Sequence, residues 1–108
     1  MDIKKVLELH LKWIQNESDG ERANLERANL NGANLKWANL EGADLDFSSG
    51  FSFRCSSFGA KIDIRIAAQM AYHFCRMTSD EPEVKSAQDQ IKDLANMFHR
   101  VGECGEIK

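Results

Sequence analysis

Residues 23–47, which read ANLER ANLNG ANLKW ANLEG ADLDF, decide the fold of this chain. Each of the five blocks has Ala first, Asn or Asp second and Leu third. A period of five fits neither an α-helix, with about 3.6 residues per turn, nor a flat strand, with a period of two. A helix would rotate successive Leu side chains by about 140°, and a strand would send them to opposite faces. The period instead predicts a chain that turns a corner in every block, so that each Ala and each Leu points inward.

The pattern A-(N/D)-L-x-x in these blocks resembles that of the pentapeptide-repeat family. The resemblance implies a mainly β solenoid: a short right-handed quadrilateral β-helix of about two coils, with four blocks in each coil. Successive coils would hydrogen-bond to each other at the strand spacing of about 4.8 Å. Leu would fill the interior, with Ala at the tighter inward positions. Asn24 and Asp44 would stack one coil apart, since short Asn and Asp side chains suit corners by bonding to nearby backbone groups.

The repeat is imperfect after residue 47, and residues 48–62 allow two registers. Strict blocks of five would put Gly50, Cys55 and Ala60 at the Leu position. A three-residue insertion at 48–50 would instead restore an apolar residue there, because Phe is then third in both FSFRC and SSFGA. We favour the insertion, since Phe is accepted at this position in the family.

Helical segments are predicted on both sides of the repeats. Apolar residues recur at helical spacing over residues 3–16, and the following NESDG supplies a stop. We expect this helix to cap the first coil and to pack His10 on its apolar side, because a bare solenoid end exposes backbone and Leu side chains. Asp63 is a natural N-cap for a second helix, and Pro82 suits the first turn of a third.

Together these segments predict a single domain of 108 residues. It would contain an N-terminal capping helix (1–20), the repeat solenoid (23–62), a C-terminal helical hairpin (63–101) and a loose tail (102–108). The hairpin is expected to lie across the open end of the solenoid.

The last predicted helix carries an apolar seam with heptad-like spacing. Its residues include Val84, Ile91, Leu94 and Phe98. Such a seam suits antiparallel packing on the preceding helix, and it equally suits a homodimer formed through the C-terminal helices. The sequence leaves both arrangements open.

Composition and charge exclude several classes of protein. No apolar run approaches the roughly 18 residues of a membrane span, and the first residues lack the apolar core of a signal peptide. Three cysteines without metal-like spacing favour reduced thiols and a cytoplasmic protein. In residues 23–62 four acidic and four basic residues cancel, so there is no basic footprint for nucleic acid. We therefore expect no membrane partner and no direct nucleic-acid partner.

Candidate chemistry is sparse, and we predict that the chain is not an enzyme. His73, Cys75, His99 and Cys104 are the residue types of a zinc site. Their spacing is poor, because side chains two residues apart on a helix point about 200° apart. No glycine-rich phosphate loop is visible either. We expect neither a metal nor a cofactor.

Aromatic residues of the repeat region are the best candidates for a binding surface. Trp37 and Phe47 are the last residues of their blocks, which normally point outward, and exposed aromatics are enriched at interface cores. The alternative is that the N-terminal helix or residues 48–50 cover them. A second candidate patch lies where the repeats meet the next helix, but we favour ordinary core filling for it. Its residues are Phe51, Phe53, Arg54 and Phe58.

These features predict a non-enzymatic interaction module that uses a rigid face and its helical cap to bind an unknown protein partner. The family resemblance also implies an alternative, a DNA mimic that protects topoisomerases. That alternative needs a long acidic rod, whereas these repeats are short and neutral. A further alternative is a small phage or mobile-element inhibitor that binds a host protein or a small signalling ligand.

Overall fold

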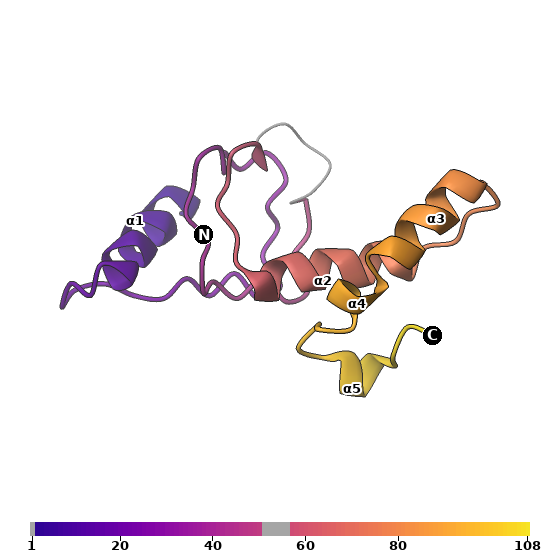
Figure 1. The fold of residues 1–108 in the computed structure, drawn as a ribbon. Coiled ribbons are helices and arrows are strands. Elements are labelled where there is room, and N and C mark those ends of the chain that lie inside the picture. Colours follow the sequence, from indigo (N-terminus) through magenta and orange to yellow (C-terminus); the bar gives the residue numbers. More distant parts are fainter. Residues whose placement is uncertain (1, 51–56) are drawn as a thin grey trace. The chain divides into compact units, whose positions relative to one another are not determined.

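The computed structural model describes residues 2–50 and 57–108. The chain divides into two compact units, Met1–Asp63 and Ile64–Lys108. Whether they behave as the single domain expected from the sequence stays a prediction. All regular secondary structure in the described residues is helical, as Figure 1 shows.

The first unit opens with helix α1, Ile3–Ile14, which confirms the helix expected there. The side chain of Asp2 caps its N-terminus by accepting a hydrogen bond from Lys5 N at 3.2 Å. After α1 the chain folds back tightly along the helix end. At Gly20, a Cβ atom would lie 2.2 Å from Trp13 N, so only glycine fits at this close approach.

The repeat segment winds so that residues about twenty apart lie side by side. Leu25 N–H donates to the carbonyl of Asp44 at 2.8 Å, and Asp44 N–H donates to the carbonyl of Ala23 at 3.1 Å. This pair of backbone bonds recurs at each of three parallel bridges. The bridges join Asn24 to Asp44, Asn29 to Ser49 and Asn39 to Lys61.

A tight turn closes each block of the repeat. The first residue of the next block donates its N–H to the Leu carbonyl three residues earlier, as Ala28 does to Leu25 at 3.0 Å. The Asn or Asp side chain accepts from the N–H two residues later, at 2.9–3.1 Å in all five blocks. The fifth residue has positive φ, as the third residue of a type II turn requires. These residues are Arg27, Gly32, Trp37, Gly42 and Phe47.

The interior of the repeat segment is a stack of Leu side chains, as predicted. Leu25, Leu30, Leu35 and Leu40 are at most 1% exposed, and Leu45 is 7% exposed. Burying a Leu side chain contributes about 1.5–3 kcal/mol, so this stack is the main apolar core of the first unit.

The predicted β solenoid, a right-handed quadrilateral β-helix, is wrong for this structure. In residues 2–50 and 57–108 no residue belongs to a β-strand or a sheet. The chain bends away after every bridge, so neighbouring twenty-residue windings meet only at isolated residues. No ladder of successive residue pairs forms between them. Turns and bridges take the place of strands.

The favoured register beyond the repeats is also wrong. Ser49 pairs with Asn29, twenty residues earlier, so strict blocks of five continue through residues 48–50. Lys61 pairs with Asn39, twenty-two residues earlier, which places an excess of two residues between Ser49 and Lys61. The insertion is therefore shorter than predicted and lies later in the chain.

The second unit is built from four helices, α2 (Ile64–Cys75), α3 (Pro82–Gln90), α4 (Lys92–Ala95) and α5 (Val101–Cys104). Helix α2 packs on α4, around a core of Ala71, Tyr72, Ala95 and Phe98. The second arm of the predicted hairpin is therefore not one helix, since α3 ends at Gln90 and a non-helical segment separates α4 from α5 (Figure 1). Phe98 belongs to that segment.

The end of the chain is held against this core, so the expectation of a loose tail was wrong. Asn96 and Ile107 exchange two hydrogen bonds, of 2.8 and 3.0 Å. The hydroxyl of Tyr72 donates to the carbonyl of Gly105 at 2.6 Å, and Arg76 Nη2 donates to the same oxygen at 2.8 Å. These contacts hold Gly105 and Ile107 against the second unit.

The Leu stack makes a testable prediction about stability. Leu35→Ala should lower the free energy of unfolding of the first unit by about 2–5 kcal/mol, through lost burial and the cavity left behind. Both tryptophans of the chain lie in this unit, so their fluorescence during urea denaturation reports on it. Lys36→Ala, at an exposed neighbouring position, is the control and should change little. Equal effects of the two substitutions would contradict the stack.

Two glycines at equivalent positions separate backbone strain from crowding. Gly32 and Gly42 have φ of 79° and 78°, so Ala at either site should cost about 1–2 kcal/mol. A Cβ at Gly32 would meet nothing within 4 Å, whereas at Gly42 it would lie 2.9 Å from Trp13 Cζ3. Gly42→Ala should therefore be the more destabilising in urea denaturation, and Trp13→Ala should remove the difference. Equal costs in the wild-type background would show that the indole does not pack on Gly42.

Candidate functional site

The candidate surface is centred on Trp37, which the repeat turn holds away from the interior. Its side chain is 82% exposed and its φ is 62°. Positive φ in a bulky residue is an outlier that costs about 1–3 kcal/mol. The turn carries this residue between two fixed hydrogen bonds, Lys36 N–H to Asn34 Oδ1 and Ala38 N–H to the Leu35 carbonyl, both of 3.1 Å. The indole is thus displayed on a defined backbone.

Two residues of the next winding, Phe58 and Gly59, lie beside Trp37. Trp37 N–H donates to the carbonyl of Phe58 at 3.3 Å. The six-membered ring of Trp37 lies over Gly59, where a Cβ atom would come within 2.5 Å of Cε3. Phe58 is itself 65% exposed. We call Trp37, Phe58 and Gly59 the Trp37 corner.

Phe58 belongs to the second candidate patch, but we favoured core filling for it because the favoured register put it at an interior position. The observed bridge between Asn39 and Lys61 places Phe58 opposite Lys36, the fourth residue of its block, which faces outward. The outward position of Phe58 could have been predicted from the sequence only if the insertion had been placed correctly.

Phe47, the other predicted outward aromatic, does not join this corner. Phe47 is 56% exposed, but it follows Trp37 by ten residues, which is half of the twenty-residue winding. It therefore lies on the opposite side of the winding. There the guanidinium carbon of Arg27 stacks over the Phe47 ring, 4.7 Å from the ring centroid. Phe51 and Arg54 lie outside the described residues.

Three of the four predicted seam residues are used inside the second unit. Phe98 is in its core, and Ile91 and Leu94 pack against that core. Val84 is half-buried on α3. This packing accounts for the apolar spacing without a second copy, and association between chains stays a prediction.

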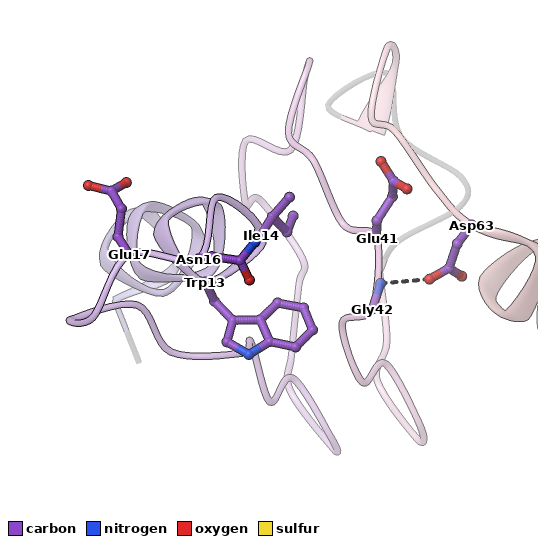
Figure 2. A pocket seen from close by; sticks show the side chains of 7 residues that line it. All are labelled: Trp13, Ile14, Asn16, Glu17, Glu41, Gly42 and Asp63. Atoms are coloured by element: carbon purple, nitrogen blue, oxygen red, sulfur yellow. Dashed lines mark hydrogen bonds between the residues drawn. The ribbon is translucent and has the colours of Figure 1, made fainter.

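A shallow hollow of about 590 Å³ lies between the end of α1 and one repeat turn (Figure 2). Its residues are Trp13, Ile14, Asn16, Glu17, Glu41, Gly42 and Asp63. Gly42 N–H donates to Asp63 Oδ2 at 2.6 Å, and the carboxylate of Glu41 pairs with Lys61 Nζ at 2.6 Å. Two of its three carboxylates therefore already have partners in the protein. Sequence reasoning missed the hollow because its walls come from segments far apart in the chain.

His10 joins α1 to the repeat segment and is fully buried. Ala23 N–H donates to His10 Nδ1 at 3.0 Å, and His10 Nε2 lies 2.8 Å from the carbonyl of Glu41. Its ring stacks on Trp13, with centroids 5.4 Å apart. Burial lowers the pKa of His10 below its ordinary value. This confirms the prediction of a packed histidine.

Cysteine and histidine chemistry is not concentrated anywhere in the described residues. No group of three or more His, Cys, Asp or Glu side chains within them could hold a metal ion. Cys75 is half-buried, and its pKa is raised, first by burial and then by the charge of Asp89. A raised pKa disfavours the nucleophilic thiolate. No described helix has the length and apolar character needed to cross a membrane.

Comparison with known proteins identifies the repeats. The family model described as pentapeptide repeats (8 copies) matches residues 21–48, which confirms the resemblance read from the A-(N/D)-L blocks. No curated protein matches the chain significantly, and no solved structure does so either.

The exposed position of Trp37 predicts that its side chain contributes little to stability. Trp37→Gly relieves about 1–2 kcal/mol of strain, which roughly offsets the conformational entropy that Gly costs, so the net change should stay within about 1 kcal/mol. Urea denaturation followed by Trp13 fluorescence measures it, with Phe47→Gly as the control at the equivalent turn position. A loss above about 2 kcal/mol would make Trp37 a structural residue.

Proposed function

We propose that this chain, in which residues 21–48 are pentapeptide repeats, is a non-enzymatic module that binds a protein partner through the Trp37 corner. Pentapeptide repeats suggest a protein-interaction module, and proteins with them are generally non-enzymatic. The observation that carries the proposal is the 82% exposure of Trp37 in a strained turn.

The energetic cost of exposing Trp37 in a strained conformation supports the Trp37 corner as the binding surface. An exposed indole gains little from burial in the free protein, and the positive φ adds strain. Tryptophan is also the residue type most enriched at the energetic centres of interfaces, because it buries a large area with few rotatable bonds. A fixed turn lowers the ordering cost of binding further. A partner that covers the indole would thus gain the free energy of burying its apolar surface, which the free chain leaves exposed to water.

The balance of charge favours apolar over electrostatic recognition. The acidic and basic residues of segment 23–62 cancel, so the segment lacks the field of a polyanion. Recognition through the Trp37 corner should therefore depend on shape and apolar contact. The affinity should change little between low and moderate salt, where screening weakens exposed charge pairs.

Matched variants test the proposal. The full chain, its Trp37→Gly variant and its Phe47→Gly variant would be immobilised and exposed to lysate of the cells that produce the chain, and bound proteins would be quantified by mass spectrometry. Both substitutions remove an exposed aromatic side chain from the fifth position of a block. The two positions lie half a winding apart. We expect one or more proteins to bind the wild type and the Phe47→Gly variant and to be depleted at least tenfold on Trp37→Gly.

Two outcomes would contradict the proposal. Capture that Trp37→Gly and Phe47→Gly leave equally intact would move binding away from the Trp37 corner. Capture of no protein above a tag-only control would argue against an interaction module.

A further inference from the structure

His10 connects α1 to the repeat segment through both of its ring nitrogens. Because Ala23 N–H donates to Nδ1 at 3.0 Å, Nδ1 must carry a lone pair. The proton of the neutral ring therefore sits on Nε2, which donates to the carbonyl of Glu41 at 2.8 Å. One side chain of α1 thus holds two points of the repeat segment, eighteen residues apart, through a single tautomer.

A second proton on this ring has no place in the structure. It would add an N–H to Nδ1, which would then face Ala23 N–H, and two donors cannot bond to each other. The ring is fully buried, so water cannot take over the lost contact without movement of the helix. Protonation therefore opposes the packed position of α1.

The charged groups around His10 act in both directions. Arg22, which follows α1, disfavours a positive ring, whereas Asp63, at the end of the unit, favours one. The Glu41 carboxylate is paired with Lys61. Desolvation of the buried ring is the largest effect, and together these groups leave the pKa of His10 below its ordinary value.

We propose that His10 is an acid-sensitive latch, whose protonation releases α1 from the repeat segment. Release would carry His10 and Trp13 away together, because both lie on α1, and it would separate the Trp13 indole from Gly42.

Proton linkage sets the direction and size of the effect. The released helix has a histidine with a pKa of about 6.5, while the packed form binds a proton only at lower pH. Above about pH 6.5 both forms are neutral and opening does not depend on pH. Below it the open form takes up one proton, so the opening constant rises about tenfold per pH unit until the packed histidine also titrates.

Hydrogen exchange of the intact chain between pH 7.5 and 5 tests the latch. After correction for the intrinsic pH dependence of amide exchange, α1 amides should exchange faster as the pH falls below 6.5, by up to about tenfold per pH unit until the packed histidine also titrates. Amides of α2 serve as the internal reference and should keep their protection. The matched variant is His10→Gln, whose amide can donate to the Glu41 carbonyl and accept from Ala23 N–H but does not titrate. Its α1 exchange should be independent of pH.

Three results would overturn the proposal. They are α1 exchange in the wild type without acid dependence, the same acid dependence in His10→Gln, and loss of protection in α1 and α2 together. Should His10→Gln fail to fold, ¹⁵N NMR of the wild-type imidazole decides. The latch requires the Nε2–H tautomer at neutral pH, and a ring that becomes charged while α1 stays protected would refute it.

Discussion

A recurring pair of backbone hydrogen bonds governs the first unit. At each bridge a Leu amide donates to a carbonyl one winding later, and that residue returns an amide bond to the preceding Ala, as Leu25, Asp44 and Ala23 do. The winding returns beside itself after about twenty residues only because the chain turns in every block. Each turn needs a residue with positive φ, and that residue points outward. The same constraint therefore packs the Leu stack and displays Trp37.

Much of the first unit could be predicted from the sequence because the five-residue period of the repeats determines which side chains face inward. The inward Leu side chains, the Asn and Asp bonds to nearby backbone and the helix α1 were all expected. The expected strands were not found in the described part of the unit, since a chain that bends after each bridge cannot build a ladder. The register beyond Ser49 also escaped prediction, because it depends on which turn Lys61 meets in space. In the second unit the apolar spacing continues across the break at Ile91, so spacing alone could not reveal that α3 ends there.

The candidate site was predictable in part for the same reason. Trp37 is the last residue of its block, and this position predicted its outward direction. Its positive φ, which it shares with Gly32 and Gly42, was not predicted. That Phe47 lies half a winding from Trp37 follows from the twenty-residue winding, which the family resemblance implied. The bonds of His10 had no sequence signal at all, because its partners are backbone atoms, and any residue type can supply these.

Direct detection of the hydrogen bonds between windings is the most decisive measurement. Scalar couplings across hydrogen bonds in NMR report which amide nitrogen is bonded to which carbonyl carbon. The structure predicts couplings from Leu25 to Asp44, from Leu30 to Ser49 and from Leu40 to Lys61. A coupling from Leu40 to Gly59 would restore strict blocks of five, and couplings to carbonyls four residues earlier would replace the winding with a helix. Either result would contradict the account given for the repeats.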